Sequence, residues 1–195
     1  MSVHIANTSL KNDAKVLVIY SSPKKDGNTK KLLDAFVSNL PATVQIKTFS
    51  AYEIGAMPCT DCGFCKQNGA CQFDDLNEFY SDFEQADLIV LATPVYNFSF
   101  PSPLKAIFDR FQRYFNAQFV RNEKPPIQKK RLAVILSTCG SDDDFGLEVI
   151  EHQAKRAFTV LNIEMFGKVV VKNMDVQGIQ PQEMQKAGLL AKALF

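Results

Sequence analysis

The stretch KVLVIYSSPKKDGNT, residues 15–29, carries the strongest indication of the fold. Its first part is a short apolar run rich in β-branched residues, which is typical of a strand buried in a sheet. A polar turn containing Gly27 follows, and residues 28–40 then repeat apolar side chains at helical spacing. The stretch therefore predicts a strand, a turn and a helix in succession, the repeating unit of a parallel sheet.

The same alternation of strand and helix continues to the end of the chain. Apolar runs at residues 87–92 and 132–136 indicate strands covered on both faces, whereas the alternating pattern of residues 43–49 indicates an edge strand. A last strand is expected around residues 165–171, and further helices over 104–115, 147–161 and 181–194. These elements predict an α/β fold with a doubly wound, five-stranded parallel sheet in the order 2-1-3-4-5 and helices on both faces. Residues 1–195 are expected to form a single domain, because this length is short for two.

Composition and charge argue against several classes of partner. The net charge is +1, so no basic surface for nucleic acid is indicated. No apolar run approaches the length of a membrane span, and residues 1–15 lack the apolar core of a signal peptide. We therefore expect a cytoplasmic protein that binds neither nucleic acid nor membrane.

Polar residues follow the first, third and fourth strands, at the carboxyl ends of the strands, where doubly wound sheets bind ligands. The turn from Ser21 to Thr29 offers hydroxyl and backbone N–H groups at the start of a helix, which is a favourable place for a phosphate. The turn matches neither the dinucleotide-binding pattern G-x-G-x-x-G nor the P-loop pattern G-x-x-x-x-G-K-[ST]. The alternative interpretation is a plain polar turn with Asn28 as the helix cap.

Two further segments give the chain a resemblance to a known family. Residues 93–98 are TPVYNF, directly after the third strand, and residues 104–110 are LKAIFDR, in the helix that follows. Together with SSP at residues 21–23 and GNT at residues 27–29, they make the chain similar to the NADPH-dependent FMN reductase branch of the flavodoxin-like superfamily. The resemblance covers roughly residues 15–140, with the motifs in the same order along the chain.

The resemblance implies an FMN site built from three loops. It places the FMN phosphate on Ser21, Pro23, Gly27, Asn28 and Thr29, and the isoalloxazine ring along Pro94, Val95, Tyr96, Asn97 and Phe98. The third loop touches the pyrimidine side of the ring or the ribityl chain through Thr138, Cys139, Gly140 and Ser141. No catalytic side chain is expected, because hydride passes from nicotinamide to flavin without a general base.

A cysteine-containing insertion is predicted at about residues 52–74, with the four thiols of Cys59, Cys62, Cys65 and Cys71. Thiols at this spacing suit a [4Fe–4S] cluster, and the motif is similar to that of the iron–sulfur flavoproteins, a related group. Relatives in the wider FMN reductase group carry similar cysteines without a cluster, so packed or redox-active thiols are an alternative. Zinc is a third alternative, although its sites usually join two pairs of ligands across a longer loop.

Three functions are compatible with these features. The first is an enzyme that passes hydride from NAD(P)H to bound FMN and then reduces a small acceptor, such as a quinone, a flavin, a nitro compound or an azo compound. The second is an electron carrier that uses FMN and a cluster on the four cysteines. The third is a flavodoxin-like binding protein without catalytic activity. The resemblance also implies a homodimer or homotetramer. The exposed aromatics among Phe98, Phe100, Tyr114, Phe115 and Phe119 are candidates for the dimer interface or for the nicotinamide face.

Overall fold

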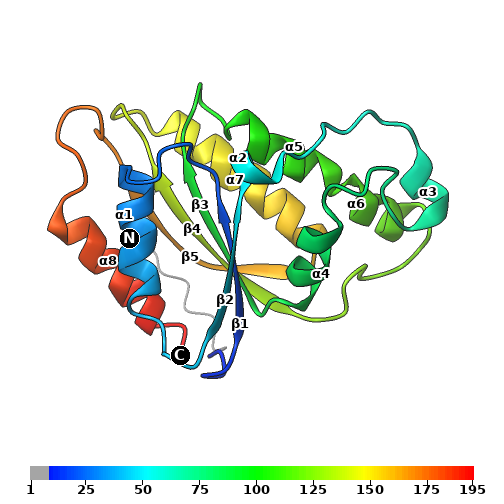
Figure 1. Ribbon diagram of the computed structural model, residues 1–195, viewed down its shortest axis with the longest axis horizontal. Coiled ribbons are helices and arrows are strands. Elements are labelled where there is room, and N and C mark those ends of the chain that lie inside the picture. The colour runs from blue at the N-terminus through cyan, green and yellow to red at the C-terminus, as the bar shows by residue number, and fades with distance from the viewer. Residues whose placement is uncertain (1–8) are drawn as a thin grey trace.

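Five parallel strands form one sheet through the middle of the molecule (Figure 1). The computed structural model describes residues 9–195, so the first eight residues of the segment considered for a signal peptide lie outside the described part. The strand order is β2-β1-β3-β4-β5, which confirms the prediction, and every neighbouring pair is parallel. The strands are β1 Lys15–Tyr20, β2 Gln45–Ser50, β3 Leu88–Pro94, β4 Arg131–Thr138 and β5 Ile163–Val171.

Helices cover both faces of the sheet, as predicted. Because successive strand residues point to opposite faces, Val16 and Val18 pack toward α1 (Asn28–Val37) and α8 (Pro181–Lys192), while Leu17 and Ile19 pack toward the other helices. That second layer consists of α4 Asn77–Gln85, α5 Ser102–Arg110, α6 Gln112–Phe119 and α7 Phe145–Val160. No helix within residues 9–195 has the length and apolar character that crossing a bilayer requires.

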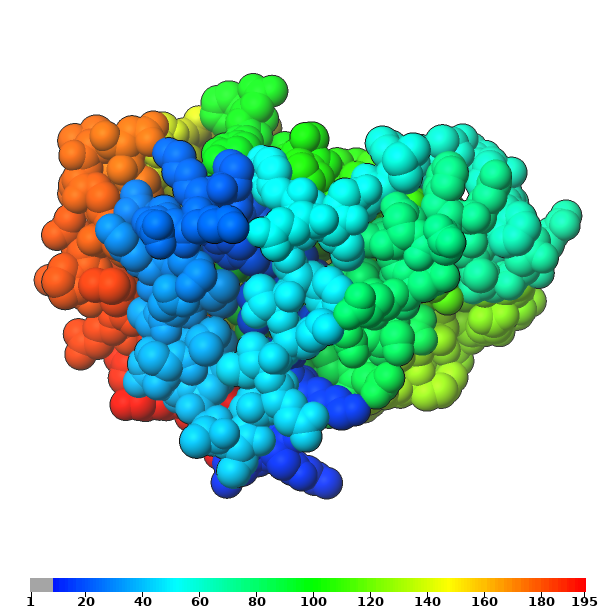
Figure 2. All heavy atoms as spheres, in the orientation of Figure 1, coloured from blue at the N-terminus to red at the C-terminus, as the bar shows by residue number. Residues whose placement is uncertain are grey.

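Two short helices flank these layers. α2 (Ala51–Ile54) follows β2 directly. α3 (Phe64–Asn68) lies within the cysteine segment and packs beside α6. Figure 2 shows this segment, in turquoise, forming the end of the molecule opposite α8. The cysteine segment is therefore a surface element outside the central layers.

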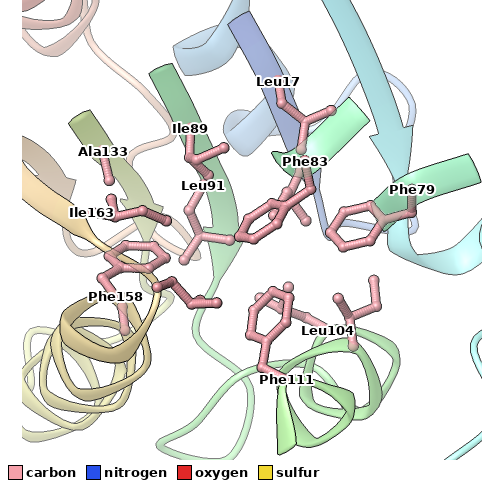
Figure 3. Close-up of a cluster of buried hydrophobic side chains, with 14 of the residues drawn as sticks. Leu17, Phe79, Phe83, Ile89, Leu91, Leu104, Phe111, Ala133, Phe158 and Ile163 are labelled. Atoms are coloured by element: carbon pink, nitrogen blue, oxygen red, sulfur yellow. The ribbon is translucent and has the colours of Figure 1, made fainter. Parts of the chain in front are cut away.

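Stacked aromatic side chains fill the core between the sheet and the second helical layer (Figure 3). The ring of Phe79 lies 5.4 Å from that of Phe83 and 5.4 Å from that of Phe49, measured between centroids. Phe83 in turn stacks on Phe111 at 5.0 Å. Phe100 and Tyr114 are buried in the same core, at 5% and 4% exposure, so their predicted place in an exposed aromatic face is wrong. Packing in this core accounts for much of the phenylalanine content.

The predicted helix over residues 104–115 is interrupted at Phe111, where α5 ends and α6 begins. Arg110 and Phe111 are both buried, at 2% and 6% exposure, although neighbours on a continuous helix point about 100° apart. The break lets Phe111 enter the aromatic core while Arg110 reaches the cysteine segment. Beyond the break, Phe115 and Phe119 are exposed and lie against each other, with centroids 4.5 Å apart.

Candidate functional site

The loops that follow β1, β3 and β4 leave the sheet at the same edge (Figure 1). In the sheet register, Tyr20 lies beside Ala92, and Pro94 lies beside Thr138. The backbone pairing continues past the strands, since Ser21 N donates to Ala92 O at 2.9 Å and Val95 N donates to Thr138 O at 2.8 Å. The structure therefore brings the three predicted loops together, although they lie far apart in the sequence.

The first loop combines buried hydroxyls with an open helix start. Ser21 and Ser22 are buried, and Ser22 Oγ accepts a hydrogen bond from Lys24 N at 3.2 Å. The N-cap of α1 is Gly27, which has no side chain to occupy the first N–H groups, and the first turn holds no acidic residue. The alternative with Asn28 as the cap is therefore wrong, because Asn28 is already the first helical residue. These N–H groups and the helix dipole favour an anion.

A pair of threonines connects the first loop to the third. Thr29 Oγ1 and Thr138 Oγ1 lie 2.7 Å apart, and both side chains are buried. A hydroxyl can donate one hydrogen bond and accept two. When one threonine donates to the other, the second still has a proton to donate. The pair thus offers a donor at the start of α1, beside the open N–H groups.

The second loop is a tight turn with a strained backbone. Tyr96 and Ser99 exchange two backbone hydrogen bonds of 3.0 Å. Between them, Asn97 and Phe98 both have left-handed φ values, of 47° and 58°. Asparagine tolerates this region, but it is costly for a bulky residue such as phenylalanine. Tyr96, Asn97 and Phe98 are all exposed, so the turn presents two aromatic side chains and backbone polar groups at the edge of the sheet.

Gly146, near the start of α7, packs directly against this second loop. A Cβ atom at Gly146 would lie 2.7 Å from Val95 Cγ1 and 3.1 Å from Phe98 Cα. Only a residue without a side chain allows the helix to approach so closely. The neighbouring Phe145 is exposed and lies edge-on against Phe98, with centroids 5.8 Å apart. Sequence reasoning missed both residues, because no motif marks a contact between distant segments.

The third loop is hydrogen-bonded to the end of β5 and to the segment that follows it. Cys139 N donates to Val171 O at 2.8 Å, and Met174 N donates to Cys139 O at 3.0 Å. Cys139 is buried, and its Sγ lies 3.5 Å from Ser141 Oγ. A Cβ atom at Gly140 would stand 2.2 Å from Asp175 Oδ2, so the Asp175 side chain lies directly against the backbone of this loop. The Asp175 carboxylate is therefore a further group at this edge that the sequence did not reveal.

Two tyrosines near the second loop stay protonated at neutral pH. Burial is the main cause that raises the pKa of Tyr20, whose hydroxyl donates to Lys24 O at 2.6 Å. Burial, with a smaller contribution from Tyr96, also raises the pKa of Tyr52, which sequence reasoning did not single out. Both phenols are therefore neutral hydrogen-bonding groups.

All four cysteines of the insertion line one cavity at the far end of the molecule. Cys59 and Cys62 are exposed, Cys65 and Cys71 are half-buried, and none is in a disulfide. Within residues 9–195, no three His, Cys, Asp or Glu side chains are grouped so that they could hold a metal ion. The structure therefore shows four free thiols around a shared cavity and no formed metal site in its described part.

Polar groups of α6 and the following turn contact the cysteine cavity. Asn116 is buried, and its Nδ2 donates to Cys65 Sγ at 3.1 Å. Arg121 donates from its guanidinium to Cys65 O. Arg110 and Arg113 also line the cavity. One of the four sulfur atoms, Cys65 Sγ, therefore has an N–H donor, and two arginine side chains line the same cavity.

Comparison with known proteins bears on both regions. The family model described as NADPH-dependent FMN reductase matches residues 14–175. An iron-sulfur flavoprotein of Archaeoglobus fulgidus is 36% identical over 104 residues, which cover 51% of this chain and 46% of that protein. An FMN-dependent NADH:quinone oxidoreductase of Clostridium perfringens is 26% identical over 189 residues, which cover 90% of this chain and 94% of that protein.

The solved structures extend the comparison to the whole fold. An NAD(P)H:quinone oxidoreductase from Methanothermobacter marburgensis superposes with a TM-score of 0.67 over 93% of this chain and 96% of that one. At 17% identity, this similarity shows a shared flavodoxin-like fold. The chain spans about half the length of the iron-sulfur flavoproteins that it matches.

Proposed function

The chain belongs to the NADPH-dependent FMN reductase family, and from this premise we propose that it binds FMN at the carboxyl edge of the sheet and reduces a small acceptor with NAD(P)H. FMN, when bound, supplies the redox chemistry, because it takes hydride from NAD(P)H and passes two electrons onward. With one proton from solvent, the overall reaction yields NAD(P)⁺ and the acceptor carrying two hydrogens.

The observation that carries this proposal is the convergence of three loops with different chemistry at one edge. The α1 start offers free N–H groups and the hydroxyls of Thr29 and Thr138, which fit a phosphate. The turn at Asn97 and Phe98 offers exposed aromatic and backbone groups, which fit a planar heteroaromatic ring. A flavin mononucleotide has both a phosphate and such a ring.

The protein's part in the reaction is to bind and orient the cofactor. We expect Ser21 and Thr29 to hold the phosphate, together with backbone N–H groups at the start of α1. We expect the turn from Val95 to Phe98 to hold the ring through its backbone, and the reciprocal hydrogen bonds of the turn and its packing against Gly146 support this role. No acid or base of the chain is required for hydride transfer.

We propose quinones and azo compounds as the first acceptors to test. The names of the relatives and structural neighbours support this choice, since they include FMN-dependent NADH:quinone oxidoreductases and an azoreductase from Bacillus anthracis. The exposed side chains of Tyr96 and Phe98 also favour a flat aromatic acceptor, which can stack beside them.

The proposal is tested by reconstituting the purified chain with FMN under anaerobic conditions and recording its visible spectrum before and after NADPH or NADH. We expect the flavin bands to bleach with at least one nicotinamide and to recover when a quinone or azo dye is added. Flavin that stays oxidised with both nicotinamides would favour a non-catalytic binding protein. A chain that takes up no FMN would exclude both functions.

A second candidate function is electron transfer through a [4Fe–4S] cluster held by Cys59, Cys62, Cys65 and Cys71. The observation that favours it is that all four sulfur residues line one cavity, where Asn116 already donates to Cys65 Sγ. The donors fit the group in type and number, because such clusters are held by four thiolates and tuned by N–H donors to sulfur, although no three of them are grouped around a single metal-ion position within residues 9–195.

Iron and sulfide analysis separates this second function from simple thiols. Protein purified anaerobically is expected to hold about four irons and four sulfides per chain if a cubane cluster forms. The variant Cys65→Ser should lose them, whereas Cys139→Ser serves as the matched control, since Cys139 lies in the third FMN loop and outside the cavity. Zinc without sulfide would point to a structural metal site instead.

We also propose a homodimer or homotetramer in the cytoplasm. The exposed pair of Phe115 and Phe119 supports self-association, because neighbouring exposed aromatics favour burial in an interface. Light scattering of wild-type protein and of the double variant Phe115→Ser with Phe119→Ser tests this point, and an unchanged oligomer would exclude α6 as the interface.

A further inference from the structure

Arg110 joins the two ends of the cysteine segment. Its Nη1 donates to Met57 O at 2.9 Å, just before the first cysteine, and its Nη2 donates to Phe73 O at 3.2 Å, just after the last. The two carboxylate oxygens of Asp75 accept further hydrogen bonds of 3.2 and 2.8 Å from the same two nitrogens. One planar guanidinium therefore closes the loop on which all four cysteines lie.

One hydrogen-bond donor of this guanidinium has no acceptor. The Arg110 side chain is 2% exposed, and its Nε–H is buried without a partner in the described part of the chain. A buried, unpaired N–H costs about 1–3 kcal/mol, so natural proteins rarely keep one without a reason. Arg110 also lines the cavity formed by the four cysteines.

We propose that Arg110 is the positioning residue of the four-cysteine site: it holds the loop in the conformation that receives a cluster, and it reserves its Nε–H for a sulfur atom of that cluster. This inference rests on the second candidate function. Sulfur atoms of an iron–sulfur cluster accept hydrogen bonds from N–H groups that are not themselves ligands, and these hydrogen bonds stabilise the bound group.

The geometry indicates that the shape of Arg110 matters more than its charge. Asp75 already neutralises the guanidinium, so the pair as a whole brings no net charge to the cavity. A lysine at this position keeps the cation but cannot reach two carbonyls and a carboxylate in one plane. Arg110→Lys should therefore behave much like Arg110→Met.

Arg113 provides a control for charge alone. It lines the same cavity, but its guanidinium lies over the rings of Tyr80 and Tyr114, at 4.4 and 5.0 Å from their centroids. Its ion pair is with Glu84, at 3.7 Å. Arg113→Gln therefore removes a positive charge beside the cavity and leaves the Arg110 contacts to the loop in place.

The experiment loads the full chain with ferrous iron and sulfide under anaerobic conditions and follows iron loss to a chelator. We expect Arg110→Met and Arg110→Lys to lose iron about 10- to 100-fold faster than wild type. The rate of iron loss from Asp75→Asn should lie between the rates of these two variants and that of wild type, because the guanidinium keeps its two carbonyl contacts. The variants Arg113→Gln and Lys105→Gln should lose iron at a rate within about 3-fold of that of wild type. FMN titration of each variant provides a readout at the other site.

The outcomes distinguish failure of the role proposed for Arg110 from failure of the cluster itself. Equal iron retention in wild type and Arg110→Lys overturns the role of Arg110, and so does an Arg113→Gln variant that loses iron as fast as Arg110→Met. Wild-type protein without iron and sulfide overturns both the cluster and this inference, while FMN binding still reports on the reductase proposal. If Arg110→Met fails to fold, as judged by its FMN binding and circular dichroism, Arg110→Lys and Asp75→Asn carry the test.

Discussion

Replacing Gly146 by alanine tests whether α7 fixes the turn at which the flavin ring is proposed to lie. The added methyl group would sit 2.7 Å from Val95 Cγ1 and 3.1 Å from Phe98 Cα, closer than atoms pack in protein interiors. The turn is held by the two hydrogen bonds between Tyr96 and Ser99, so it must move as a unit. Its backbone groups then leave the positions from which they are proposed to contact the ring.

Two opposing effects determine the change in folding stability. Alanine is favoured over glycine in a helix by about 1 kcal/mol, whereas overpacking costs about 1–3 kcal/mol. The free energy of unfolding should therefore fall by between zero and about 2 kcal/mol, and the melting temperature by up to about 8 °C for a chain of this length. FMN affinity should fall about 10-fold, equivalent to about 1.4 kcal/mol.

Fluorescence titration of FMN and thermal melts measure both effects. Val95→Ala combined with Gly146→Ala removes one of the two close contacts and should recover part of the affinity. Gly188→Ala is the matched control, because a Cβ there meets only the flexible end of Asn39 and lies on α8, which packs on the other face of the sheet. Unchanged FMN affinity together with a raised melting temperature in Gly146→Ala would refute the role of this contact.

Three further predictions follow from other contacts. Thr29→Val removes a hydroxyl from the pair with Thr138 and should weaken FMN binding about 3- to 10-fold by titration, and equal affinity would place the phosphate elsewhere. Burial raises the pKa of Glu151, but its bonds to Lys155 and Lys168 outweigh this and lower it, so its stabilising effect is present above about pH 4.3 and is lost as the pH falls further. Thermal melts from pH 7 to 3 should therefore show a smaller loss of stability with acid in Glu151→Gln than in wild type. Identical pH dependence in the two proteins would contradict a stabilising role for these ion pairs. Asn116→Leu removes the donor to Cys65 Sγ and should lower the reduction potential of a bound cluster in a redox titration, whereas an unchanged potential would exclude the hydrogen bond.

The sheet and its three loops were predictable because they follow from local pattern. Continuous apolar runs indicated β3 and β4, the alternating run indicated the edge strand β2, and a doubly wound order then placed the loops after β1, β3 and β4 at one edge. Strand ends fix where a loop starts. Residues such as Ser21 and Thr138 were therefore located correctly at that edge without any knowledge of their contacts.

Contacts between distant segments were not predictable. Gly146 allows α7 to approach Phe98, yet no motif marks it in the sequence. Gly140 was expected in the third loop, but its contact with the Asp175 carboxylate was not. The break at Phe111 also has a tertiary cause. The apolar spacing of residues 104–115 favours a continuous helix. The helix breaks because Arg110 is buried against the cysteine segment while the next residue, Phe111, is buried in the core, and the two side chains point in different directions.

The same helix positions both candidate sites. α5 begins directly after the turn that holds Phe98 and ends at Arg110, which closes the cysteine segment. Its nine residues span about 13 Å, and Leu104 and Ile107 anchor it in the aromatic core. A rigid, buried helix does not change length, so the spacing between the turn at Phe98 and the cysteine loop is set by secondary structure and not by loop conformation. A substitution that loosens Arg110 should therefore disturb the cysteine loop while leaving the turn at Phe98 in place, which is why FMN titration is an independent readout for the Arg110 variants.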